Sequence, residues 1–108
     1  MILSISGEGY AQLLECDYLQ RLHCETALAP ADKDLLDAAL SGIASRDADH
    51  AWISTAWLKA AGARSQDAAW LPRFETMIDK ARPYGWVSAD GQSVKAHIVW
   101  NKPLKEAT

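Results

Sequence analysis

The sequence predicts a mainly α-helical domain with a small β-hairpin, an α+β fold class. Apolar residues recur at helical spacing in three stretches, near residues 9–23, 32–45 and 65–82. Residues 86–100 are predicted to form a strand, a tight turn and a second strand, with Asp90-Gly91 at the turn. A chain of 108 residues that is 49% hydrophobic can form one domain with its own core. We expect a single domain over 1–108, made of an N-terminal arm and helix (1–31), a core (32–100) and a polar tail (101–108).

The first two helices are predicted from their apolar stripes. The stripe in residues 9–23 consists of Tyr10, Leu13, Leu14, Tyr18 and Leu22. Pro30 separates this helix from the next one, which is expected over residues 32–45. Acidic residues at 32 and 34 suit the start of that second helix, where the helix dipole favours negative charge.

The second half of the chain predicts a strand, two helices and a hairpin. Ala51-Trp52-Ile53 is apolar and β-prone, and Ser54-Thr55 offers a cap for a short helix that Gly62 ends with a left-handed residue. Pro72 belongs in a first helical turn, so the next helix should begin near Leu71-Pro72. Its core face would consist of Leu71, Phe74, Ile78 and Ala81. In the last strand, one face would carry Val94, Ala96, Ile98 and Trp100, and the other Ser93, Lys95, His97 and Val99.

This order of elements over residues 32–100 resembles the winged helix–turn–helix superfamily, in an arrangement with an additional N-terminal helix. The resemblance implies a third helix that enters the major groove of double-stranded DNA and a hairpin that touches the flanking backbone. It implies that the DNA contacts come from Arg64, Ser65, Gln66, Arg73, Thr76, Lys80 and Lys95. The function it implies is that of a small, non-catalytic transcriptional regulator, working as a two-fold dimer.

The charge of the chain is unevenly distributed between its two halves. The net charge is −3 overall, but residues 1–50 carry three basic and nine acidic residues. Residues 51–108 carry eight basic and five acidic residues. A basic half joined to an acidic half fits a surface that faces a polyanion, and the alternative is ordinary surface charge that happens to segregate.

Two sets of residues have alternative interpretations. Tyr10, Leu14, Tyr18 and Leu22 form either a homodimer interface or a face that packs on the domain's own core. Trp70 is either an exposed interface anchor or a core residue. The competing function is a protein–protein interaction module, such as a phage- or plasmid-type inhibitor or an assembly subunit.

Catalytic and metal sites are not expected. Cys16, His23 and Cys24 match no familiar zinc spacing, and no nucleophile motif or phosphate-binding loop is present in the sequence. We expect no enzyme activity, no cofactor and no bound metal. The sequence also contains no signal-peptide pattern or bilayer-length apolar run, so we expect a cytoplasmic protein with two reduced thiols and no membrane association.

Overall fold

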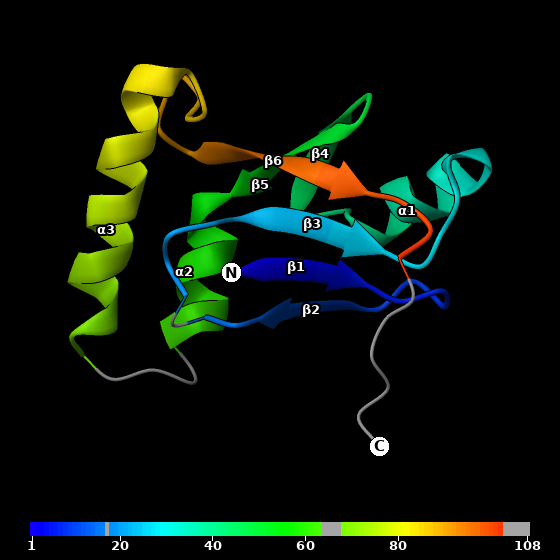
Figure 1. The fold of residues 1–108 in the computed structure, drawn as a ribbon, viewed down its shortest axis with the longest axis horizontal. Helices are drawn as coiled ribbons and strands as arrows, with labels where there is room; N and C mark the ends of the chain where they lie inside the picture. The colour runs from blue at the N-terminus through cyan, green and yellow to red at the C-terminus, as the bar shows by residue number, and fades with distance from the viewer. Residues whose placement is uncertain (17, 64–67, 103–108) are drawn as a thin grey trace.

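A six-stranded mixed β-sheet forms the centre of the protein in the computed structural model, which describes residues 1–16, 18–63 and 68–102 (Figure 1). The strand order is β2-β1-β3-β6-β5-β4. Strand β3 pairs in parallel with β1 and β6, and the other neighbours are antiparallel. The strands are β1 (Ile2–Ile5), β2 (Ala11–Leu14), β3 (His23–Thr26), β4 (Ala44–Asp47), β5 (His50–Ser54) and β6 (Ser93–Val99).

The helices lie behind the sheet and across one end of it. The first two are α1 (Lys33–Ala39), preceded by the short 3-10 helix η1 (Pro30–Asp32), and α2 (Thr55–Ala63). Both lie behind the sheet in the view of Figure 1. Helix α3 (Trp70–Ala81) stands across the end at which β1, β3 and β6 begin, and it continues into the 3-10 helix η2 (Arg82–Tyr84). Among the described residues, no helix has the length and apolar character needed to cross a membrane.

The predicted mainly α-helical fold class, with its winged-helix arrangement, is therefore wrong. Residues 9–23, expected as a helix, form β2, a connecting segment and the start of β3. Gly9 and Glu15 have positive φ values of 89° and 50° at either end of β2, which a helix would not accommodate. Pairing with β1 makes Ala11–Leu14 a strand, in which Ala11 and Leu13 pack partly buried against the core, although local periodicity predicts a helix there. Residues 1–31 thus supply three strands of the sheet rather than an arm and a dimerisation helix.

The second predicted helix is also too long. Helix α1 ends at Ala39, and residues 44–47 form β4, which pairs with β5. Gly42, with a φ of 79°, lies in the turn between them. The apolar Ile43 and Ala44 contact the core from the turn and strand rather than from the helix.

The predicted hairpin exists only in part. Val87 makes an isolated antiparallel bridge to Val94, and no described strand covers residues 86–88. Strand β6 instead pairs with β3 and β5 in the middle of the sheet. Its alternation is as predicted, because Val94, Ala96 and Ile98 are buried while Lys95 and His97 lie on the opposite face.

Trp70 connects α3 to the core. Its side chain is 1% exposed, it stacks on Phe74, and its indole Nε1 donates a hydrogen bond of 2.6 Å to the carbonyl of Cys16. The core interpretation of Trp70 is confirmed and the exposed-anchor alternative is wrong. Leu71, predicted to face the core, is 43% exposed instead.

Candidate functional site

A cleft of about 1060 Å³ lies between α3 and the face of the sheet that α1 and α2 leave uncovered. Its walls come from three segments that are far apart in the sequence. The first is the segment that leads into β3, the second is one side of α3, and the third runs from η2 into β6. The lining residues are Tyr18, Leu19, Gln20, Arg21, Leu22, His23, Arg73, Thr76, Met77, Lys80, Ala81, Tyr84, Trp86, Val94, Lys95, His97 and Val99.

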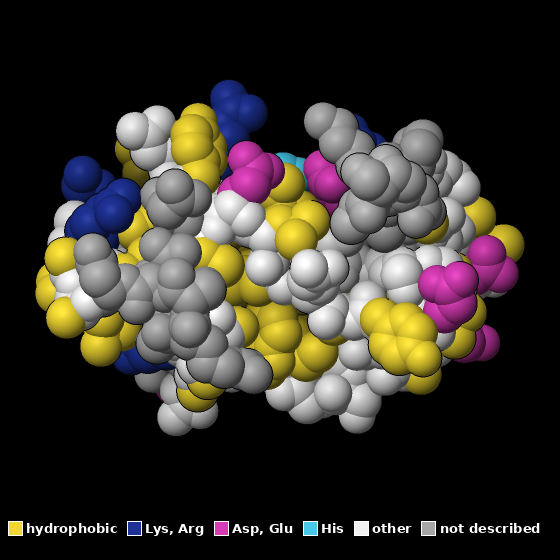
Figure 2. All heavy atoms as spheres, turned by 90° about the horizontal axis from the view of Figure 1, so that it is seen from below, with side chains coloured by type: hydrophobic (Ala, Val, Ile, Leu, Met, Phe, Trp, Pro, Cys, Tyr) yellow, Lys and Arg dark blue, Asp and Glu magenta, His cyan; other side chains and the backbone are white. Residues whose placement is uncertain are grey.

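The charged residues that line the cleft are all basic. Arg21, Arg73, Lys80 and Lys95 line it, and among the described residues that line it none is acidic. Figure 2 shows several Lys and Arg side chains at the α3 end of this face, and Asp and Glu side chains near its middle and at the opposite end. A protein with a net charge of −3 thus presents a locally positive cleft, and local charge decides which ligands approach.

The amphipathic pattern of α3 places its basic residues in the cleft. Phe74 and Ile78 are buried on one side of the helix, which leaves Arg73, Thr76 and Lys80 exposed on another. The Thr76 hydroxyl donates a hydrogen bond of 3.0 Å to the carbonyl of Pro72, one turn earlier. The proline lies in the first turn of α3, as predicted, where its missing N–H disrupts no helical hydrogen bond.

The opposite wall is held by the first residue of the chain. The amino group of Met1 donates hydrogen bonds to the carbonyls of Tyr18 and Arg21, at 2.6 and 2.7 Å. The Met1 side chain is 1% exposed and belongs to the core. These contacts fix the segment before β3 and therefore the wall that carries Arg21.

Two exposed aromatic rings stand at the third wall. Gly85, with a φ of 76°, turns the chain between Tyr84 and Trp86. The two rings stack with their centroids 4.9 Å apart and their planes inclined by 25°. Tyr84 remains 70% exposed and Trp86 51% exposed, so the stacked pair keeps much of its aromatic surface in water.

The three histidines form a row across the sheet. His97 is the register partner of both His23 and His50, and the rings of His50 and His97 meet edge to face at 5.4 Å. His23 Nε2 lies 2.9 Å from Glu25 Oε1, whose carboxylate is 4.0 Å from the Lys102 ammonium. Within the described part of the chain, no three His, Cys, Asp or Glu side chains are grouped so that they could hold a metal ion.

Cys24 does not offer a nucleophile. Its side chain is fully buried, and burial, with a smaller effect of the neighbouring Glu25 charge, raises the pKa of the thiol to about 12. The thiolate is the reactive form, and it is scarce at neutral pH at such a site. Cys16 and Cys24 are both free.

The turn after Trp86 is stabilised by its own acidic residue. The Asp90 carboxylate accepts hydrogen bonds from the Ser88 hydroxyl at 2.6 Å and the Gln92 backbone at 3.0 Å. The hydrogen bonds from Ser88 and Gln92 hold the pKa of Asp90 below its usual value. This carboxylate therefore shapes the turn that was expected to form a wing.

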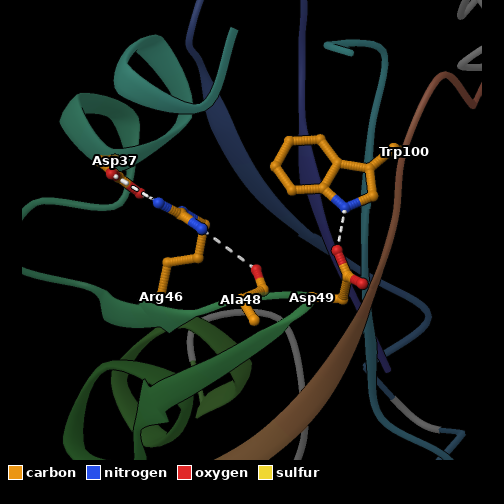
Figure 3. Close-up of polar contacts among 5 residues, drawn as sticks. All are labelled: Asp37, Arg46, Ala48, Asp49 and Trp100. Atoms are coloured by element: carbon orange, nitrogen blue, oxygen red, sulfur yellow. Dashed lines mark hydrogen bonds and ion pairs between the residues drawn. The ribbon is translucent and has the colours of Figure 1, made fainter. Parts of the chain in front are cut away.

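A second polar cluster, at the end that carries α1, is structural (Figure 3). Arg46 donates to both carboxylate oxygens of Asp37, at 2.6 and 3.2 Å, and to the carbonyl of Ala48 at 3.2 Å. These contacts connect α1 to the β4–β5 hairpin. The Trp100 indole donates to the Asp49 carboxylate at 3.0 Å.

The structure brings together four of the residues predicted to contact DNA. Arg73, Thr76, Lys80 and Lys95 line one cleft, although they reach it from a fold that was not expected. Arg64, Ser65 and Gln66 lie outside the described residues. The predicted interface set is dispersed, because Tyr18 and Leu22 line the cleft, Tyr10 and Leu14 are exposed beside and on β2, and Trp70 is buried.

Sequence reasoning missed Arg21, Tyr84 and Trp86 as cleft residues. Arg21 falls within the helix predicted over residues 9–23, which does not form, and no local pattern brings it near α3. The motif Tyr84-Gly85-Trp86 does carry a signal, since two aromatic residues flank a glycine directly after a helix.

No family model matches the chain, and no curated protein or solved structure shows significant similarity to it. The resemblance to the winged-helix superfamily therefore stays untested by comparison.

Proposed function

We propose that the protein binds DNA without catalysis, through the cleft between α3 and the sheet. The observation that carries this proposal is the described part of the lining, which holds four basic residues and no acidic one in a chain of net negative charge. The cytoplasmic location expected from the sequence goes with this proposal, since both described cysteines are free thiols. A role in transcriptional regulation stays a prediction.

The chemistry of the lining suits a phosphate backbone. Arginine and lysine side chains neutralise phosphates and release condensed counterions, so the affinity falls as salt rises. Each phosphate contact changes the slope of log K against log salt by ~0.7 for a single strand. Four basic residues therefore predict a slope of about −3 for the binding constant of the cleft. Tyrosine, histidine and tryptophan side chains beside these cations offer contacts to sugars and bases.

Removal of two cleft charges tests the proposal. The double variant Arg73→Ala/Lys80→Ala should bind fluorescently labelled DNA at least about tenfold more weakly in an anisotropy titration at low salt, because two phosphate contacts are lost. The salt slope should become shallower by about 1.4. Both side chains are exposed, and polar contacts of exposed side chains contribute only about 0–1 kcal/mol each, so the thermal midpoint should change little.

Lys33→Ala is the control. Lys33 is an exposed lysine at the start of α1 that does not line the cleft. It removes a positive charge without touching the cleft, and we expect nearly unaltered binding. Absence of DNA binding by the unsubstituted protein at low salt would contradict the proposal. An equal loss of DNA affinity per removed charge in the control and the cleft variants would contradict it too.

The alternative of a protein-interaction module also stays a prediction. The observation that favours it is the outer strand β2, which among the described strands pairs with β1 alone and leaves Leu14 36% exposed. Tyr10, directly before this strand, is 74% exposed. An edge strand with exposed apolar side chains is the kind of surface on which another chain adds.

A further inference from the structure

We propose that the cleft takes single-stranded rather than duplex DNA, and that an unpaired base stacks on the Tyr84–Trp86 pair. This inference rests on the proposed function and names the form of DNA that the cleft selects. It is carried by three features together: the concave placement of the basic residues, the exposed stacked rings, and the position of both on the walls of one cleft.

The concave placement argues against a duplex. A helix that reads the major groove must project from the surface, because the groove of B-DNA receives it as an insertion. Here Arg73, Thr76 and Lys80 form one wall of a cleft whose other walls carry Arg21 and Lys95. Cations that face a shared hollow surround a flexible strand on more than one side, which a rigid double helix does not allow.

The aromatic pair supplies what an unpaired base needs. Tyr84 and Trp86 are stacked on each other and remain 70% and 51% exposed. An exposed aromatic surface in water has a favourable partner in the planar face of a base, and such stacking tolerates any sequence. In a duplex the bases are already stacked on their neighbours, so the same rings would gain no base contact.

The combination of rings and cations is what single-strand binding requires. Phosphates of an unpaired strand would meet Arg21, Arg73, Lys80 and Lys95, while a neighbouring base reaches the rings. Aromatic stacking beside a positively charged groove is the general mode by which proteins hold single strands without reading sequence. DNA binding with little base specificity follows from this arrangement.

The test compares strands and variants in one titration. Labelled oligothymidine of about 12 nucleotides should bind more tightly than a duplex of the same length at equal salt, since the length suits a site of this kind. Tyr84→Ala and Trp86→Ala should each weaken single-strand binding by about 5- to 150-fold. Their salt slopes should stay unchanged, because no phosphate contact is lost.

Three controls separate stacking from folding and charge. Tyr84→Phe and Trp86→Phe keep an aromatic ring and should retain most of the affinity. Tyr10→Ala removes an equally exposed tyrosine that does not line the cleft and should bind as the unsubstituted protein does. Thermal midpoints identify any variant that fails to fold, and the phenylalanine variants then carry the comparison.

The outcomes that overturn this inference differ from those that overturn the proposed function. Equal or tighter binding of the duplex, or alanine variants that bind the single strand normally, would refute single-strand selection and leave DNA binding intact. Tighter binding of oligouridine than of oligothymidine would reassign the cleft to RNA. Failure to bind any of these probes at low salt would refute both proposals.

Discussion

At the scale of single residues, some polar side chains stabilise the fold and others line the cleft. Asp37 and Arg46 belong to the first group, since their side chains join α1 to β4. The hydrogen bond from Arg46, assisted by its positive charge, holds the pKa of Asp37 below its usual value. A carboxyl group whose pKa is lowered in the folded state stabilises the protein only at pH values at which it is ionised.

Asp37→Asn tests this contact. At pH 7 the variant should have a free energy of unfolding lower by up to about 1 kcal/mol, because the Asp37 side chain is 44% exposed and solvent weakens the pair. The contribution is present above the unfolded pKa of about 3.9 and is lost as pH falls through the lower folded pKa. Urea unfolding at pH 7 and below about pH 3 should therefore show a difference that disappears in acid.

Asp34→Asn is the matched control, on the same helix and with no ion pair or side-chain hydrogen bond assigned to it among the described residues. We expect Asp34→Asn to lower the free energy of unfolding at pH 7 by less than Asp37→Asn does. An Asp37→Asn difference that persists unchanged in acid would show that the carboxylate charge is not the source of the stabilisation.

At the scale of elements, the sequence predicts the second half of the chain better than the first. The β5 strand, the start of α3 near Pro72 and the alternation of β6 are confirmed. Each depends on local signals: a short apolar run, a proline suited to a first turn, and a period of two. The helix predicted over residues 9–23 is wrong because their apolar spacing fits a helix, whereas pairing with β1, a tertiary effect, makes Ala11–Leu14 and the residues from His23 onward strands.

Gly62 has a structural role that differs from the predicted one. It was expected to end a helix in a left-handed conformation, yet it lies inside α2, which runs to Ala63. A Cβ atom placed at this position would overlap the six-membered part of the Trp70 indole. The glycine therefore permits the close approach of α2 and α3.

Gly62→Ala should destabilise the protein by about 1–3 kcal/mol, because a buried indole must shift to make room. Helix propensity alone predicts the opposite, since alanine is favoured over glycine by ~1 kcal/mol within a helix. The measurement is the free energy of unfolding in denaturant. In a Trp70→Phe background, Gly62→Ala should lower the free energy of unfolding by a smaller amount. A Gly62→Ala protein that is more stable than its parent would contradict the packing role.

At the scale of the whole molecule, the cleft is a product of topology. Arg21 and Lys80 are far apart in sequence and line the same hollow only because β3 pairs with β6 and α3 stands at their first residues. The charge difference between the two halves of the chain did indicate a basic surface. It could not indicate that Arg21, from the acidic half, would complete that surface.

The site was therefore predicted in part. A family resemblance and helix periodicity predict Arg73, Thr76, Lys80 and Lys95, and the exposed face of α3 does carry the first three. The concavity, the aromatic pair and the opposite wall needed the mixed sheet. No pattern of local spacing encodes a parallel pairing between residues 23–25 and 97–99.

The measurement that tests the central claim most directly is a titration of isotope-labelled protein with oligothymidine, followed by amide chemical shifts. The account predicts that the shifts change in the three walls of the cleft, around Arg21–His23, Arg73–Lys80 and Tyr84–His97. Amides near Asp37 and Arg46, at the opposite end, should remain unperturbed. Changes confined to that opposite end, or an unaltered spectrum at low salt, would show that the cleft does not bind DNA.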